Sequence, residues 1–199
     1  PDCGPLTKLL KSIDWDALDL RYLIVEASRN NVEFPFYERL DSQLSNDIVR
    51  RISGIIELKY QRFLKGLTTI TELFEKSGID YVIFKTIPPY KYLPRDVDIL
   101  VSGEDFKKAK NLLVSKGFKL TKTHIFHKEI TLAKNDFEID LHWQIEWMGS
   151  RVISENSILH NHSTCKVGHT NIRIPNATHE FLLLSAHAIL QHHYVTLGE

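Results

Sequence analysis

Two patterns of hydrophobic residues divide the chain near Gly78. Before it, apolar side chains recur at helical spacing. The strongest series follows Ser45-Asn46-Asp47 and consists of Ile48, Ile52, Ile55, Ile56, Phe63, Leu67, Ile70 and Phe74. This spacing predicts one long helix of about eight turns, which ends at Gly78. Two shorter helices are expected before it, one capped by Asp14 and one over 37–44, after a break at Pro35.

After Gly78 the pattern changes to short apolar runs and alternation, which favour β-strands. A helix interrupts them over 102–117, with Ser102 and Asp105 as its capping box. Asn135-Asp136 is typical of a hairpin turn between two of the strands. Strands are expected over 81–84, 97–101, 118–123, 129–133, 137–143 and 166–174.

These elements indicate an α+β fold with a mixed β-sheet. We expect a helical N-terminal region over 1–78, an α+β core over 79–175 and a C-terminal helix over 176–199. The chain begins at Pro1 rather than Met and stops just after an apolar helical run. We therefore expect a fragment, with further helical residues beyond position 199.

Composition narrows the classes of protein. The 25 Lys and Arg residues balance the 25 Asp and Glu residues, so no overall charge attracts nucleic acid. The sequence contains no run of 18 or more apolar residues, so a membrane span is not expected. Cys3 and Cys165 are too few for a disulfide framework, which favours a reducing, cytoplasmic environment.

The candidate chemistry begins with Asp96 and Asp98. Two residues apart on a strand, they point to one face, while Val97 and Ile99 point to the other. Paired carboxylates repel each other unless a cation lies between them, and their hard oxygen atoms suit Mg²⁺ or Mn²⁺. Taken alone, Asp-x-Asp is more often a polar strand edge or turn. The apolar surroundings favour the metal site, because an unpaired buried carboxylate costs several kcal/mol.

The strand over 137–143 carries a second polar face, formed by Glu138, Asp140 and His142. As a neighbour of the first strand, it could bring Asp140 beside the aspartate pair. Asp140 is then a candidate metal ligand and general base, with Glu138 as its rival. His142 either orients Asp140, approaches the substrate, or is a satisfied core histidine.

Arg95-Asp96-Val97-Asp98 after a strand and loop, followed by Asp140-Leu141-His142-Trp143, resembles the polymerase-β-type nucleotidyltransferase superfamily. The stretch 81–143 is most similar to its uncharacterised bacterial and archaeal group. The resemblance implies a palm-like mixed sheet with Asp96 and Asp98 as shared metal ligands. It also implies Asp140 as the third carboxylate and ATP or another nucleoside triphosphate as the donor.

The turn at Lys85-Thr86 departs from the pattern, because the family usually has glycine where the backbone approaches the triphosphate. A β-branched residue resists positive φ. Either Thr86 offers its hydroxyl to a phosphate, or the turn is remodelled and nucleotide binding is weakened. Lys85 could neutralise a phosphate or be solvated, and Arg95 could clamp phosphate or pair with a carboxylate.

Three functions follow from these residues. The first is a metal-dependent nucleotidyltransferase that moves a nucleoside monophosphate to a hydroxyl acceptor, which could be a small molecule, a protein or RNA. Asp96, Asp98 and Asp140 would be catalytic and metal-ligating, with Lys85, Thr86 and Arg95 binding the nucleotide. The alternatives are a non-catalytic binding protein of the same fold and a toxin–antitoxin component.

Overall fold

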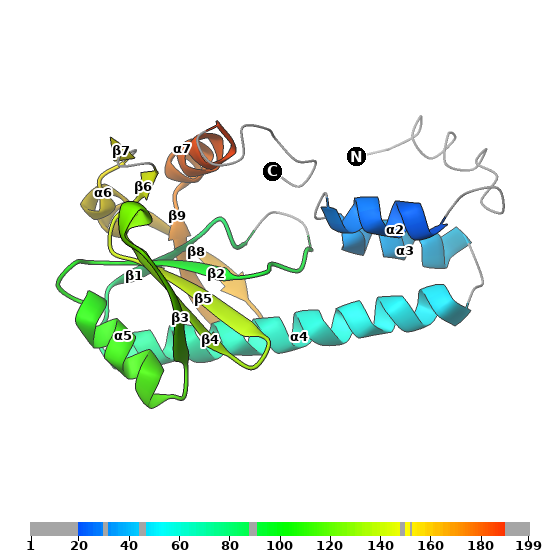
Figure 1. The fold of residues 1–199 in the computed structure, drawn as a ribbon, viewed down its shortest axis with the longest axis horizontal. Coiled ribbons are helices and arrows are strands. Elements are labelled where there is room, and N and C mark those ends of the chain that lie inside the picture. Colours follow the sequence, from blue (N-terminus) through cyan, green and yellow to red (C-terminus); the bar gives the residue numbers. More distant parts are fainter. Residues whose placement is uncertain are drawn as a thin grey trace.

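The computed structural model of the chain describes residues 20–29, 32–43, 47–87, 91–147, 150–151 and 153–189. The predicted cap at Asp14, the thiol of Cys3 and the expected helical continuation beyond 189 lie outside these ranges. Figure 1 shows a sheet with helices on both faces, and one long helix that extends beyond the sheet to two shorter helices.

The N-terminal part is helical, as expected. Its helices are α2 (Leu20–Arg29), α3 (Glu33–Gln43) and α4 (Asp47–Lys76). The break predicted at Pro35 is wrong, because α3 starts two residues earlier and includes it. Proline is tolerated in a first helical turn, where the missing N–H has no partner within the helix. Tyr37, Leu40 and Val49 bury a small core between α3 and α4.

The central sheet has the order β1-β2-β5-β4-β3. β2 and β5 run parallel and the other neighbours are antiparallel, so the predicted mixed sheet is confirmed. The turn at Asn135-Asp136 joins β4 to β5, and Asn135 adopts a left-handed φ of 54°. The strands are β1 (Tyr81–Phe84), β2 (Val97–Val101), β3 (Lys119–His124), β4 (Glu129–Lys134) and β5 (Phe137–His142).

Helices pack on both faces of this sheet. On one face, α4 and α5 (Phe106–Ser115) cover the larger core, whose β2 members are Val97, Ile99 and Val101. On the other, α6 (Glu155–His160) and α7 (Ala177–His187) cover a smaller core that includes Leu100. Asp98 shares the face of Leu100, so the predicted polar face of β2 looks toward α6 and α7.

The stretch 166–174 was expected to be one strand and is instead part of a hairpin. β8 (His162–Val167) and β9 (Thr170–Pro175) pair antiparallel. The turn contains Gly168 with a φ of 62°, a conformation that glycine adopts without strain. The smaller elements are η2 (Ile125–His127), β6 (Glu146–Trp147) and β7 (Ser150–Arg151).

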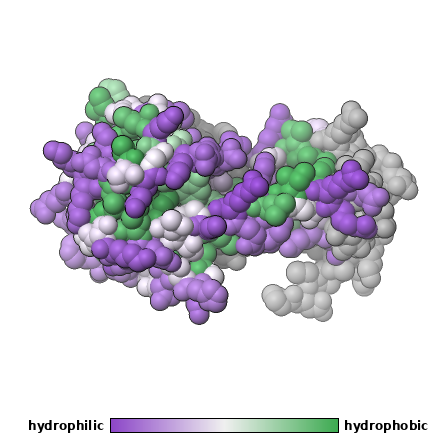
Figure 2. Space-filling model, turned by 90° about the horizontal axis from the view of Figure 1, so that it is seen from below, coloured by the Kyte–Doolittle hydropathy of each residue, from purple (hydrophilic) through white to green (hydrophobic). Residues whose placement is uncertain are grey.

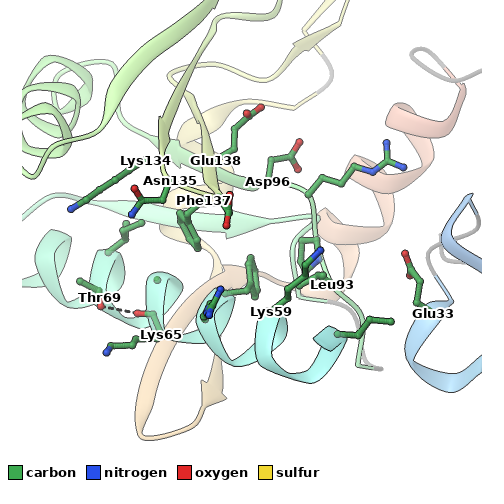
Figure 3. A pocket seen from close by; sticks show the side chains of 18 of the residues that line it. Glu33, Lys59, Lys65, Thr69, Leu93, Asp96, Lys134, Asn135, Phe137 and Glu138 are labelled. Atoms are coloured by element: carbon green, nitrogen blue, oxygen red, sulfur yellow. Dashed lines mark hydrogen bonds between the residues drawn. The ribbon is translucent and has the colours of Figure 1, made fainter. Parts of the chain in front are cut away.

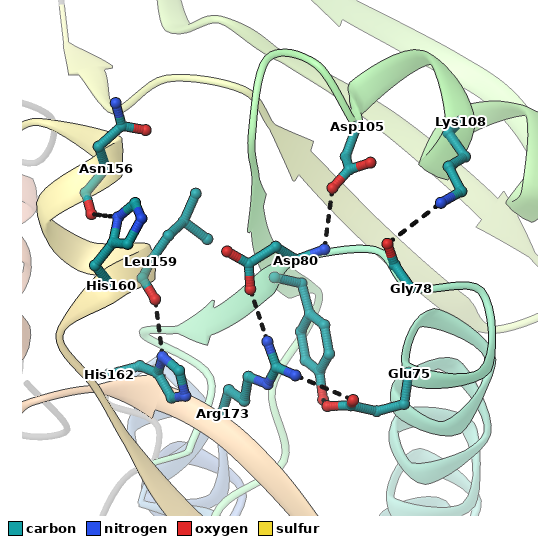
Figure 4. A network of polar contacts seen from close by, with 11 residues as sticks. Glu75, Gly78, Asp80, Asp105, Lys108, Asn156, Leu159, His160, His162 and Arg173 are labelled. Atoms are coloured by element: carbon teal, nitrogen blue, oxygen red, sulfur yellow. Dashed lines mark hydrogen bonds and ion pairs between the residues drawn. The ribbon is translucent and has the colours of Figure 1, made fainter.

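A polar network fastens the end of α4 to β1 and β9 (Figure 4). The Arg173 guanidinium donates to Asp80 at 2.7 Å and to Glu75 at 3.1 Å. The Asp80 N–H donates to the carboxylate of Asp105 at 3.1 Å. The capping box predicted at Ser102 and Asp105 is therefore only half formed. The Ser102 hydroxyl accepts the Asp105 N–H, but the Asp105 carboxylate bonds Asp80 rather than returning to Ser102.

No described helix is both long enough and apolar enough to cross a membrane. Viewed from below, hydrophilic side chains cover much of the surface, and hydrophobic ones gather in smaller groups (Figure 2). Cys165 is a free, partly buried thiol on β8.

Two glycines of α4 differ in their surroundings, and this yields a prediction. A Cβ at Gly66 would lie 2.4 Å from a ring carbon of Phe137, whereas nothing lies within 4 Å of one at Gly54. We expect Gly54→Ala to raise the free energy of unfolding by about 0.5–1 kcal/mol, because alanine is the better helix former. Gly66→Ala should lower it by about 1–3 kcal/mol through overpacking.

Urea unfolding of both variants measures the difference. Phe137→Leu in the Gly66→Ala background should recover part of the loss, because it removes the clashing ring. Equal stabilisation by both alanines would contradict the close packing of Phe137 on α4.

Candidate active site

The register of the sheet brings two predicted site residues together. Asp98 on β2 lies opposite Asp140 on the parallel strand β5 and opposite Phe84 on the antiparallel strand β1. The expectation that the Asp140 strand lies beside the Asp98 strand is therefore confirmed.

Asp98 lies between the ammonium group of Lys85 and the imidazole ring of His142. Its Oδ1 is 3.2 Å from Lys85 Nζ and 2.9 Å from His142 Nε2, and the side chains of Asp98 and Lys85 are only 10% and 13% exposed. Burial alone would raise the pKa of Asp98, but Lys85 and His142 outweigh it and lower the pKa to about 2. Burial likewise opposes the charge on Lys85, yet Asp98 raises the pKa of that lysine. Both groups of this ion pair are therefore ionised at neutral pH.

Asp96 precedes β2 and is only partly buried. Burial raises its pKa to about 6, and the neighbouring charges of Asp98 and Asp140 act in the same direction. The three carboxylates predicted to act together are thus near enough to influence one another. Asp140 Oδ1 is buried and has no hydrogen-bond partner among the residues that the structure describes. The rival Glu138 pairs loosely with Lys122, at 3.8 Å.

The turn after β1 is held by side chains as well as by the backbone. Lys85 has a left-handed φ of 55°, and its N–H donates to Glu180 Oε1 at 3.0 Å. The Thr86 hydroxyl donates to the Phe84 carbonyl at 2.9 Å and accepts the Asp98 N–H at 3.1 Å. The strained φ therefore falls on Lys85 rather than on Thr86, whose hydroxyl closes the turn onto β2.

A cavity of about 1130 Å³ opens beside Asp96. Arg95, an exposed residue, lines it together with Asp96. Figure 3 shows Asp96 and Glu138 on the sheet side of the cavity, and Lys59 and Lys65 on α4 across from them. Of the predicted nucleotide-binding residues, Arg95 therefore faces this cavity, while Lys85 contacts Asp98. Residues 88–90 of the loop before Arg95 lie outside the described residues.

Two further carboxylates, Glu129 and Glu180, lie close to His142 and Lys85 and were not predicted from the sequence. Glu129 Oε2 lies 3.2 Å from His142 Nδ1, and burial raises the pKa of Glu129. Burial also raises the pKa of Glu180 to about 6, and within the described part of the chain its Oε2 atom has no hydrogen-bond partner. The Glu129–His142 pair could have been found from the register of a hairpin centred on Asn135-Asp136. Glu180 gave no local signal, because it reaches Lys85 from 95 residues away.

His142 is buried between Asp98 and Glu129, which fits the satisfied core histidine among the three roles that the sequence left open. The contacts with Lys85 and His142 therefore hold the Asp98 carboxylate ionised. Among the residues that the structure describes, no three His, Cys, Asp or Glu side chains already surround one point as metal ligands. The roles of Asp96, Asp98 and Asp140 as ligands remain predictions.

The buried ion pair yields a prediction for stability. We expect Asp98→Asn to lower the free energy of unfolding at pH 7 by about 3–5 kcal/mol, because it removes the carboxylate that balances the buried charge of Lys85 at 3.2 Å. The double variant Asp98→Asn/Lys85→Met should lose much less. Since the pKa of Asp98 is lowered from 3.8 to about 2, the gap between wild type and Asp98→Asn should close as the pH falls through this range. Chemical unfolding measures both effects, and a loss as large in the double variant would contradict the pairing.

Asp96 should behave in the opposite way. Its folded-state pKa is raised from 3.8 to about 6, so ionisation of Asp96 destabilises the fold fully above about pH 6 and not at all below 3.8. We expect Asp96→Asn to be more stable than wild type at pH 7.5, with the gain disappearing near pH 3.8. Asp136→Asn, which removes an exposed carboxylate of the adjacent hairpin, controls for the lost charge. A gain that does not change with pH would contradict this electrostatic cause.

Comparison with known proteins agrees with the resemblance seen in the sequence. No curated protein is significantly similar to the chain. Among the solved structures that are similar over part of it, two serve as examples. One is the lincosamide antibiotic adenylyltransferase LnuA with bound lincomycin, at 18% identity and a TM-score of 0.46, covering 59% of this chain and 83% of that one.

The other is a protein of Thermotoga maritima described as a nucleotidyltransferase, at 12% identity and a TM-score of 0.47, covering 61% of this chain and 81% of that one. Residues 12–198 match the family of uncharacterised nucleotidyltransferases. Since the match spans nearly the whole sequence, the chain belongs to this nucleotidyltransferase family.

Proposed function

We propose that the protein transfers a nucleoside monophosphate from ATP or another nucleoside triphosphate to a hydroxyl acceptor. The observation that best supports this is the pairing of Asp98 with Asp140 on adjacent parallel strands, with Asp96 near enough to be influenced by both. Clustered carboxylates on a sheet face destabilise the fold, so their presence favours a role in binding cations.

The residues fit a divalent cation in their chemistry. Asp96, Asp98 and Asp140 offer only oxygen atoms, which Mg²⁺ and Mn²⁺ prefer, and Asp140 Oδ1 is buried with no partner among the described residues. When bound, the ion would neutralise charge on the triphosphate and on the leaving group. Asp98 Oδ1 already contacts Lys85, so this lysine would have to move for that oxygen to become a ligand.

The chain's own residues would then accept the proton and contact the phosphates. Asp140 accepts the proton of the acceptor hydroxyl, whose oxygen attacks the α-phosphorus in line, and pyrophosphate leaves. Lys85 and Arg95 would pair with phosphate oxygens. The Thr86 hydroxyl is engaged within the turn, so its contribution to nucleotide binding would be to fix the backbone beside Asp98. A nucleoside triphosphate and a free thiol at Cys165 both suit a cytoplasmic protein.

The second candidate is a non-catalytic nucleotide-binding protein of the same family. The Lys85–Asp98 ion pair favours it, because the lysine ammonium occupies the place where a divalent cation would be expected. The two candidates predict different outcomes in one assay.

The decisive measurement is transfer of label from α-labelled nucleoside triphosphates with Mg²⁺ or Mn²⁺, in a cell extract depleted of macromolecules and in one that retains them. We expect a labelled product with wild type, and a loss of at least about a hundredfold in Asp96→Asn and Asp140→Asn, the size expected for removing a group that acts in the transition state. Glu104→Gln, at an exposed carboxylate outside the site, should leave the rate unchanged.

Nucleotide binding without transfer in any extract would establish the non-catalytic candidate instead. Because the acidic variants change stability, folding of each variant has to be checked by its thermal unfolding at the assay temperature.

A further inference from the structure

The cavity beside Asp96 has a distinct arrangement of charge. It lies between α4, the N-terminal helices and the turn that joins β4 to β5. Three cations of α4, Lys59, Arg62 and Lys65, line it at intervals of three residues, which places them on adjoining turns. With about 1.5 Å of rise per residue they span roughly 9 Å of the helix.

None of these three cations has a hydrogen bond or ion pair within the described part of the chain. Other cations near α4 do: Lys76 pairs with Glu72, and Lys91 pairs with Glu57. Arg95, on the far wall beside Asp96, is likewise unpaired among the residues that the structure describes. The α4 side of the cavity, which carries three of these unpaired cations, attracts anions.

The acidic residues of the cavity lie apart from the cations of α4. Asp96 and Glu138 are on the sheet side, as Figure 3 shows, while Asp136 is in the hairpin turn and Glu33 begins α3. Glu33 Oε2 is buried and has no hydrogen-bond partner among the described residues. A buried carboxylate oxygen without a donor is costly, so a ligand hydroxyl there would stabilise it.

The volume of the cavity limits the size of the ligand that it can bind. About 1130 Å³ is close to the upper end of small-molecule pockets, which are roughly 300–1,000 Å³. The equal numbers of basic and acidic residues in the chain, 25 of each, disfavour a long nucleic-acid footprint.

We propose that this cavity binds the acceptor, and that the acceptor is a small phosphorylated compound with several hydroxyl groups. Its phosphate lies against Lys59, Arg62 and Lys65, and one hydroxyl extends toward Asp96. This inference rests on the proposed nucleotidyl transfer for its role, but the binding site can be tested without catalysis.

The test uses a panel of sugar and polyol phosphates, including ribose 5-phosphate and glycerol 3-phosphate, each compared with its dephosphorylated form. Titration calorimetry is done in EDTA, which removes divalent metal, and without donor nucleotide, so the heat reports binding of the phosphorylated compound alone. We expect phosphorylated members to bind and their dephosphorylated forms to bind at least about tenfold more weakly, as loss of a charge-assisted contact implies. Binding should also weaken with added salt.

Lys59→Gln/Lys65→Gln should weaken binding of the phosphorylated compounds by at least about tenfold. Lys107→Gln/Lys119→Gln removes the same charge from exposed positions of α5 and β3 and should change nothing. Because Lys59 and Lys65 are exposed and unpaired among the described residues, the variant should keep the wild-type melting temperature.

Several results would overturn the inference. They are no preference for phosphate anywhere in the panel, equal weakening by both double variants, or binding of a short RNA alone. Label transfer to an unphosphorylated acceptor, unaffected by Lys59→Gln/Lys65→Gln, would also overturn it while leaving the transferase activity established. Phosphate-dependent binding without any label transfer would instead contradict the proposed function and support the binding site.

Discussion

The ion pair between Lys85 and Asp98 is the interaction on which the rest of the site depends. Asp98 is buried on β2, whose other residues are all apolar. Lys85 and His142 together keep its carboxylate ionised. Holding the lysine there requires a left-handed turn, which the carboxylate of Glu180 and the hydroxyl of Thr86 stabilise. Residues from the turn after β1, from β2 and β5 and from α7 thus converge around one buried negative charge.

The two faces of the sheet explain why the carboxylates lie where they do. Val97 and Ile99 are fully buried against the core under α4 and α5, so the alternation of a strand forces Asp98 to the opposite face. The parallel register then sets Asp140 beside it. A slip of one residue would turn both carboxylates into the larger core, so packing on one face fixes the chemistry on the other.

This logic also explains what the sequence could predict. The long helix and most of the strands follow from local periodicity, and the structure agrees with them. The failures involve either turn chemistry or distant contacts. Gly168 divides an expected strand into a hairpin, and a proline in a first helical turn does not end a helix. Glu180 joins the site only through tertiary packing, which periodicity does not reveal.

The balance of charge links the turn to the proposed reaction. With five carboxylates near Lys85 and His142, the site carries more negative than positive groups, which opposes the approach of a triphosphate. A divalent cation brought with the nucleotide would reverse this, and Lys85 could then leave Asp98 for a phosphate oxygen without becoming unpaired. Since Thr86 anchors the turn to the Asp98 backbone, the lysine could exchange partners through its side chain while its backbone stays in place. A threonine where the family usually has glycine is thus compatible with nucleotide binding, provided that the phosphate contacts the lysine rather than the turn backbone.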